Sequence, residues 1–522
     1  MPGNGQRQAL PGAARSIAAD REGLFPIRLI RPASDQPACT NRHLPGNGHR
    51  EAIQTLNMKK RDEKRMEKYK KKIRPEERLA AFFQRKGEIT RREKLAIVWQ
   101  MSVPAIMAQI TSIFMQYIDQ AMVGSLGAQA SASIGVVSTS TWLLSGLCSG
   151  AATGFSVQAA HQIGGRREVN ARKILKHGLA ASLCFSLLLM IIGIALSSHL
   201  PVWLGAGEEL WKDASGYFFV YACSLPAVQL NRLAGSMLQC SGNMRTPSIL
   251  NASMCLLDIF FNMIFIRHYG VLGAAIGTAL AELVVCVLML WTVCFRSPVF
   301  RFRREKLGGI DKRILFNALH IGAPLAFEHV AVCGAMIATT RIIAPLGTVA
   351  IAANSFAVTA ESFCYMPGYG IAEAATALVG QSLGAGKEKI AKSFSNLSVL
   401  LGGGIMAVTG AVMFFICPWV FQLMTPDLQV RQLAAEVLRI QLFAEPLYGV
   451  SIVASGALRG AGDTLVPSIL NLISIWGVRL TLALLLVGRW GLHGVWTAMC
   501  IELCVRGLLL LFRQQTSVLT RP

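Results

Sequence analysis

The strongest constraint on the fold is an internal repeat that divides the apolar part of the chain into two matching halves. One constant offset relates the halves without a gap, and residues related by it are called repeat counterparts below. They include Pro104 and Pro324, Gly127 and Gly347, Gly150 and Gly370, Pro226 and Pro446, and Glu282 and Glu502. The segment 247–251, PSILN, recurs as 467–471. Repeated apolar halves of this length predict two copies of one membrane bundle, an arrangement common among secondary transporters.

Hydropathy places both copies in a bilayer. The sequence is 53% hydrophobic and 15% charged, with a mean hydropathy of +0.46. Segments of about 20 apolar residues, enough to cross a hydrocarbon core of ~30 Å, are predicted at 96–121, 133–159, 177–199, 214–238, 248–267, 271–295, 314–343, 350–379, 393–417, 432–455, 467–487 and 491–512. We therefore predict an all-α polytopic membrane protein with twelve transmembrane helices in two six-helix lobes. An even number of spans per copy implies a pseudo-two-fold axis along the membrane normal.

The net charge of +22 is distributed unevenly. Basic residues concentrate in residues 1–94 and in the loops on the same side of the predicted membrane, including Arg166, Arg167, Arg172, Lys173, Lys176, Arg296, Arg301, Arg303, Arg304, Lys306, Lys312 and Arg313. Loops on the other side hold Lys212, Arg267, Arg431 and Arg489. By the positive-inside rule, both termini are predicted to be cytoplasmic. Topology and lipid headgroups account for this basicity, so we expect no nucleic-acid partner.

The predicted boundaries divide the chain into six parts. Residues 1–57 lack the apolar core of a signal peptide and are expected to be a disordered upstream extension, with native translation starting at Met58. The other parts are a basic cytoplasmic segment at 58–94, an N-lobe at 95–295, a cytoplasmic inter-lobe loop at 296–313, a C-lobe at 314–512 and a cytoplasmic tail at 513–522.

Ionisable residues inside the spans are the candidates for function, because each costs ~2.5–3.5 kcal/mol at mid-depth on insertion scales. Asp119 lies near the end of the first span, and its repeat counterpart is Thr339. A function that needs a single acid would break the symmetry in this way. Glu282 and Glu502 occupy matched positions and are predicted to be structural, paired with a neighbouring Arg.

Asp258 and Asn262 lie one helical turn apart on the fifth span and therefore share a face. A carboxylate and a carboxamide provide hard oxygen ligands for Na⁺, or a proton site with a hydrogen-bonding partner. The alternative is a polar network that only packs helices together. The spacing does not separate these two interpretations.

Enzymatic chemistry has no visible site in this sequence. No Ser/His/Asp, HExxH or paired-carboxylate arrangement stands out, and the 13 Cys residues form neither a CxxC pair nor a Cys/His metal cluster. We therefore expect a protein that is not an enzyme, with no cofactor, and with no metal beyond Na⁺ at Asp119, Asp258 and Asn262.

Three segments resemble the MATE (multidrug and toxic compound extrusion) family of cation-coupled efflux antiporters. They are Ile118–Gly124 with Leu126–Gly127, Glu361–Gly370 continuing through Ala374–Gln381, and Leu458–Thr464 with its first-half copy Leu238–Asn243. The resemblance covers about residues 90–515. It implies a fold of two six-helix lobes.

The resemblance implies roles for particular residues. Asp119 matches the first-helix acid that takes part in proton or Na⁺ coupling. One branch places Asn before Asp on the fifth helix, whereas here Asp258 precedes Asn262. A second branch places acids on helices seven and ten. Glu328 lies about one turn before the acid position on the seventh helix, and the tenth span holds no Asp. Residues expected in gating or substrate contact are Glu361, Glu373, Glu328 and Asn231.

The resulting hypothesis is a secondary active efflux antiporter of the cell membrane, driven by an inward H⁺ or Na⁺ gradient through alternating access. Its expected substrates are small organic, cationic compounds, and we expect a monomer in the lipid bilayer. The alternative is a lipid-linked oligosaccharide flippase of the same wider superfamily, which often has more spans and several Arg in its cavity. A membrane scaffold would leave the intramembrane acids unexplained.

Overall fold

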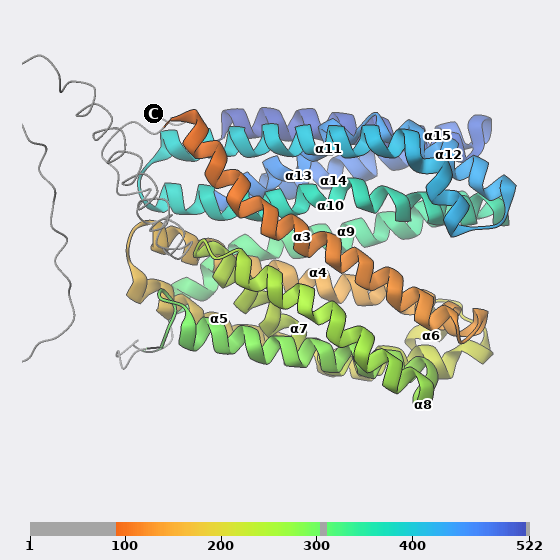
Figure 1. Cartoon of the computed structure of the whole chain (residues 1–522), viewed down its shortest axis with the longest axis horizontal. Coiled ribbons are helices and arrows are strands. Elements are labelled where there is room, and N and C mark those ends of the chain that lie inside the picture. Colours follow the sequence, from red (N-terminus) through yellow and green to blue (C-terminus); the bar gives the residue numbers. More distant parts are fainter. Residues whose placement is uncertain (1–89, 303–308, 310, 518–522) are drawn as a thin grey trace, which may run out of the picture. The chain divides into compact units, whose positions relative to one another are not determined.

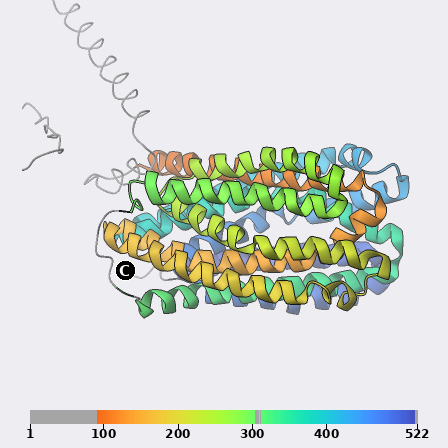
Figure 2. The same ribbon diagram turned by 90° about the horizontal axis from the view of Figure 1, so that it is seen from below.

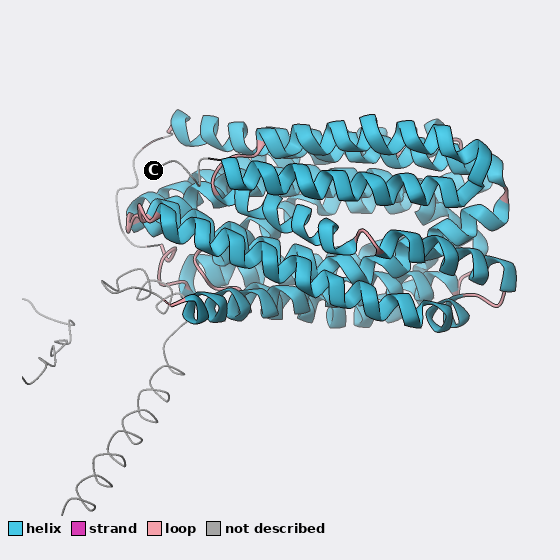
Figure 3. Cartoon of the chain, turned by 90° about the horizontal axis from the view of Figure 1, so that it is seen from above, coloured by secondary structure: helices cyan, strands magenta, loops and turns pink. Residues whose placement is uncertain are grey.

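A computed structural model describes residues 90–302, 309 and 311–517, all of which belong to one compact unit. The expectations for residues 1–57, for most of 58–94 and for the end of the C-terminal tail lie outside the described residues. All regular structure in the described ranges is helical (Figure 3).

The first lobe is built from five long helices and one short one. They are α3 (Arg91–Gly124), α4 (Ala128–Gly164), α5 (Glu168–Leu196), α6 (Leu200–Trp203), α7 (Glu208–Cys240) and α8 (Arg245–Trp291), followed by the π-helix η1 (Thr292–Arg296). The capping box of Thr90 and Glu93 starts α3, since each satisfies a backbone N–H of the other.

The second lobe follows the same order. Its elements are α9 (Lys312–Ile343), η2 (Ala344–Leu346), α10 (Thr348–Gly384), α11 (Glu388–Met424), α12 (Leu428–Leu442), α13 (Glu445–Gly460), α14 (Leu465–Ile473), η3 (Ser474–Leu480) and α15 (Thr481–Thr516). Helix α10 starts and ends at the repeat counterparts of the first and last residues of α4, and α11 starts at the counterpart of the first residue of α5. The repeat in the sequence is therefore also a repeat in the structure.

Two of the helical segments each contain two spans. Seven helical segments in the described residues are long and apolar enough to cross a membrane, and two of these, Arg245–Arg296 and Leu465–Thr516, are 52 residues long. Each is broken at a glycine with positive φ, Gly270 at 58° and Gly491 at 55°. Glycine adopts this conformation at no steric cost, so the chain reverses there.

Three further spans bring both lobes to six. Helices α7 and α10 occupy the places of the predicted spans 214–238 and 350–379. The pair α12–α13 is long and apolar enough as one span and bends by 58° just before Pro446. Proline cannot donate the helical hydrogen bond at this position, which favours a break. The predicted fold class, twelve spans in two six-helix lobes, is confirmed.

Helices α3 and α9 join the lobes. Figure 1 shows α3 running obliquely from beside α11 in the second lobe to beside α8 in the first, and Figure 2 shows the helices lying side by side along one common direction. Helix α3 packs on α10, and α9 packs on α4. These two contacts are equivalent under the repeat, as a two-fold relation between the lobes requires.

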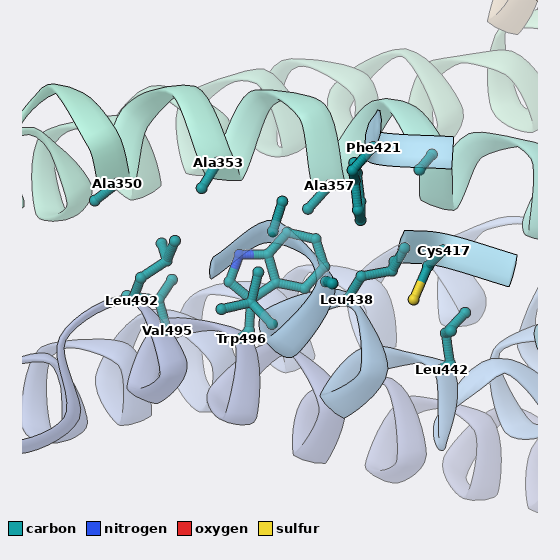
Figure 4. Close-up of a cluster of buried hydrophobic side chains, with 14 of the residues drawn as sticks. Ala350, Ala353, Ala357, Cys417, Phe421, Leu438, Leu442, Leu492, Val495 and Trp496 are labelled. Atoms are coloured by element: carbon teal, nitrogen blue, oxygen red, sulfur yellow. The ribbon is translucent and has the colours of Figure 1, made fainter. Parts of the chain in front are cut away.

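The core of the second lobe fixes the position of α10. Trp496 of α15 is fully buried against a row of alanines on α10, and its indole N–H donates to Asn354 Oδ1 at 3.0 Å (Figure 4). Ala350, Ala353 and Ala357 lie on one face of α10 at helical spacing. Small side chains allow membrane helices to approach closely. This packing fixes the rotation of α10 about its own axis and therefore the directions in which its polar side chains point.

Candidate functional site

The first lobe brings together the three residues predicted to bind the coupling cation. Asn262 Nδ2 of α8 donates to Asp119 Oδ1 of α3 at 3.0 Å and to Asp258 Oδ2 at 3.2 Å. The carboxylates of Asp119 and Asp258 also lie within hydrogen-bonding reach of each other. The order Asp258 then Asn262 is therefore compatible with a single convergent site, because both residues share the face of α8 that packs on α3.

This first-lobe site is secluded and has unused oxygens. Asp258 is fully buried, Asn262 is 1% exposed and Asp119 is half-buried. Asp258 Oδ1 and Asn262 Oδ1 are buried without a hydrogen-bond partner among the described residues. Tyr217 of α7 lies within electrostatic range of both carboxylates. Buried polar atoms are normally satisfied, and these two oxygens have the capacity to accept a further hydrogen bond or to coordinate a cation.

Glycine makes room for the carboxamide. Gly277, on the second half of α8, packs so closely on Asn262 that a Cβ atom would collide with Asn262 Oδ1. The reversal at Gly270 places the two halves of α8 side by side, and the missing side chain lets Asn262 lie between them.

The second lobe has no copy of this arrangement. The repeat counterparts of Tyr217, Asp119, Asp258 and Asn262 are Val437, Thr339, Val478 and Leu482. Two carboxylates that approach each other repel unless a proton or a cation lies between them. Among the described residues, this combination of two adjacent carboxylates with a carboxamide is therefore specific to the first lobe.

Glu373 links the two lobes. On α10 of the second lobe, it accepts hydrogen bonds from Gln109 Nε2 of α3 at 2.9 Å and from Gln239 Nε2 of α7 at 2.8 Å. Both donors belong to the first lobe. Lys94 Nζ adds a contact between lobes, donating to Ser393 Oγ at 3.1 Å.

Glu328 of α9 lies inside the second lobe. Its two oxygens accept from Ser468 Oγ and Asn471 Nδ2 of α14, each at 2.7 Å. Both donors come from the repeated PSILN segment. The repeat counterpart of Glu328 is Ala108, so this contact is also specific to one lobe.

Asn231 and Glu282 form a pair in the first lobe. Asn231 Nδ2 of α7 donates to Glu282 Oε1 of α8 at 2.7 Å, and Asn231 Oδ1 is buried without a partner among the described residues. Arg232, the next residue, directs its Nη2 to Ser145 Oγ at 2.6 Å. The donor to Glu282 is therefore an amide, whereas an Arg was expected.

Glu361 forms a second acidic group, together with a residue that sequence analysis missed. Gln441 Nε2 of α12 donates to Glu361 Oε1 at 3.3 Å, and Glu445 of α13 lies within electrostatic range. Glu445 is fully buried, and neither of its carboxylate oxygens has a partner in the described part of the chain. The tenth span holds no Asp, but it does hold this buried Glu. The sequence feature that could have identified Glu445 is its position directly before Pro446, at the break between α12 and α13.

Glu502 forms ion pairs with two arginines beside this acidic group. Its Oε2 lies 2.6 Å from Arg479 Nη2, and its Oε1 lies 3.1 Å from Arg506 Nε. Both guanidinium groups are within electrostatic range of Glu361. Both ion pairs involve Glu502, so Glu361 and Glu445 have no ion-pair partner in the described part of the chain.

Comparisons with known proteins agree with this architecture. The family model described as MatE matches residues 104–264 and 324–485, two segments that begin at repeat counterparts. A probable multidrug resistance protein NorM of Thermotoga maritima is 26% identical over 445 residues, which cover 81% of this chain and 94% of that protein.

Solved structures share the fold. A transporter of the MOP superfamily from Pyrococcus furiosus is similar with a TM-score of 0.78 at 20% identity, covering 82% of this chain and 97% of that one. A D35N mutant of the Vibrio cholerae MATE transporter VcmN also gives 0.78 at 18% identity, covering 82% and 99%. The family model covers more than half of the sequence, once in each lobe. The chain therefore belongs to the MatE family, the MATE transporters.

Proposed function

We propose that this protein is a secondary active efflux antiporter that exports organic compounds in exchange for inward movement of H⁺ or Na⁺. The observation that carries the proposal is the buried cluster of Asp119, Asp258 and Asn262, with two oxygens that no residue of the described chain satisfies. The name of the relative in Thermotoga maritima, a probable multidrug resistance protein, supports small organic substrates.

In this mechanism, Asp119 and Asp258 bind the coupling cation and Asn262 orients them. A bound proton or Na⁺ removes the repulsion between the two carboxylates, so the compact first-lobe site is favoured only when it is loaded. A ligand shifts a conformational equilibrium only through different affinities for the two states. Asp119 is half-buried on α3, the helix that also packs on the second lobe, so its loading can change the packing between lobes.

Glu373 is the proposed gating residue. It accepts from two first-lobe glutamines at once, and these bonds must break if the lobes separate there. By the positive-inside rule, the C-terminal end of α7, which carries Gln239, faces the cytoplasm, as do both termini. We take this arrangement as the one closed toward the cytoplasm, with lobes 95–295 and 314–512 moving as bodies relative to each other. Asn231, Glu328 and Glu361 are proposed to act in substrate contact or gating.

The test is dye uptake into everted vesicles from cells that express the full chain, because eversion turns export into accumulation in the lumen. Collapsing the proton gradient and the sodium gradient separately identifies the coupling ion, because only loss of the coupled gradient stops transport. Transport that survives the collapse of both gradients would refute cation coupling. Vesicles from cells without the protein provide the background rate.

A further inference from the structure

The last span of the first lobe ends in a tightly folded turn at the edge of the membrane. The apolar helical segment Arg245–Arg296 finishes in the π-helix η1, and residues 292–302, called the η1 turn below, fold back beside it. The N–H of Phe302 donates to the carbonyl oxygen of Cys294 at 2.9 Å. This bond brings the two ends of the η1 turn next to each other, so their side chains share one patch of surface.

Buried groups fix the η1 turn to the first lobe. Val293 and Phe300 are fully buried in the core of that lobe. Arg172 of α5, itself only 3% exposed, donates from Nη1 to the carbonyl oxygen of Val299 at 3.0 Å. The residues between these anchors therefore have fixed places on the surface.

The large exposed side chains at the η1 turn are basic or aromatic. Arg296 and Arg301 are exposed, as are the rings of Trp291, Phe295 and Phe302. The guanidinium carbon of Arg296 lies 4.5 Å from the centre of the Trp291 ring, a cation–π contact. Aromatic rings beside long basic side chains are typical of the headgroup level, where the rings contact lipid and the charges reach water.

The positive charge of this patch is not cancelled by acids of the chain. Neither Arg296 nor Arg301 forms an ion pair with another residue in the described ranges. Arg172, which holds the turn from below, pairs with Glu168 at 3.5 Å, so that acid already has a basic partner. The patch therefore attracts an anion from outside the protein.

The second lobe lacks such a patch, although the fold is repeated. The repeat counterparts of Phe295 and Arg296 are Gln515 and Thr516. Helix α15 continues through them, and Gln515 Nε2 donates to Asn396 Oδ1 of α11 at 3.0 Å. The end of a lobe can thus be closed by neutral side chains that bond to one another. The exposed arginines and rings of the first lobe are not required by the fold, which indicates a separate role.

We propose that the η1 turn is a binding site for an anionic phospholipid, with Arg296 and Arg301 on its phosphate and the exposed rings against its glycerol and acyl chains. Guanidinium groups form paired, charge-assisted hydrogen bonds with phosphate. A lipid fits better than free phosphate, because apolar rings at the end of a span adjoin the charges. By the positive-inside rule the site faces the cytoplasmic leaflet. The inference is independent of the proposed transport activity.

Native mass spectrometry of the purified full chain in detergent tests the site. Dioleoylphosphatidylglycerol and dioleoylphosphatidylcholine are matched probes, because they share acyl chains and a phosphate and differ in net charge. The wild-type protein should bind the anionic lipid about 25-fold more tightly, from about fivefold for each basic residue. The double variant Arg296→Gln/Arg301→Gln should bind both lipids equally. Arg245→Gln/Lys389→Gln removes the same charge from exposed residues on the same predicted side and should keep the preference.

Equal affinity of the wild-type protein for the two lipids would overturn the site, however the variants fold. A preference that persists in the double variant at positions 296 and 301, or that is lost equally in the control, would also overturn it. Retained binding of phosphatidylcholine shows that the double variant is folded. Excess inorganic phosphate should leave the bound lipid in place, and displacement by phosphate would refute a site for the whole lipid.

Discussion

His161 and Gln381 are repeat counterparts that bind the opposite lobe in equivalent ways. His161 Nε2 is 2.8 Å from the carbonyl oxygen of Gly460, and Gln381 Nε2 donates to the carbonyl oxygen of Cys240 at 2.6 Å. Gly460 and Cys240 are themselves repeat counterparts. These two hydrogen bonds between the lobes, at the ends of α4 and α10, therefore follow the same two-fold relation as the helices.

Gln381→Leu should weaken this contact and favour separation of the lobes. Loss of one hydrogen bond worth about 1 kcal/mol shifts a two-state equilibrium about fivefold. Electron paramagnetic resonance distances between spin labels on the turns after α4 and α10 should show a larger population at long distance. His161→Leu should have a similar effect by symmetry. An unchanged distance distribution in both variants would show that these bonds do not hold the lobes together.

Asp119→Asn should abolish cation-driven substrate exchange while the protein still folds, because the amide keeps the shape but removes the charge that attracts the cation. Counterflow in proteoliposomes with an imposed ion gradient measures the effect. Thr339→Val changes the counterpart in the second lobe and should retain exchange. Wild-type turnover by the Asp119 variant would disprove the assigned role.

Gly277→Ala should disturb the first-lobe site without removing any of its ligands. The added methyl group collides with the carboxamide of Asn262, which overpacks the core at a cost of about 1–3 kcal/mol and displaces that side chain. We expect cation-driven exchange to fall, as measured by counterflow. Gly404→Ala is the matched control, since a Cβ at Gly404 meets no atom within 4 Å. Equal activity of the two variants would contradict the close packing at Asn262.

Glu502→Gln should lower thermal stability more than Glu282→Gln, although the two residues are repeat counterparts. Removing the charge of Glu502 leaves Arg479 and Arg506 without their closest counter-charge, a loss of about 3–5 kcal/mol for a buried pair. Gln at position 282 can still accept from Asn231, so the loss there should be about 1 kcal/mol. Thermal unfolding of the purified proteins, followed by tryptophan fluorescence, compares the two. Equal losses would show that the ion pairs at Glu502 add little.

Much of the fold follows from the order of the residues. The repeat, the apolar segments and the paired glycines predict two six-helix lobes, since apolar length decides which segments span a bilayer and repeated segments fold alike. Asp119 was identified for the same reason: a lone acid opposite Thr339 stands out in a repeated sequence.

The sites depended on contacts between residues far apart in the chain. Asp119 meets Asn262 across 143 positions, and Glu373 meets Gln109 across 264. Glu445 was missed because an acid inside a broken span resembles a loop residue until packing buries it. The sequence by itself determined which segments cross the membrane and that they form two related halves, because hydrophobicity and repetition are local properties. Only the tertiary structure decided which acids lie next to each other, which pair with an arginine and which join the lobes, because these outcomes depend on helix rotation and close packing.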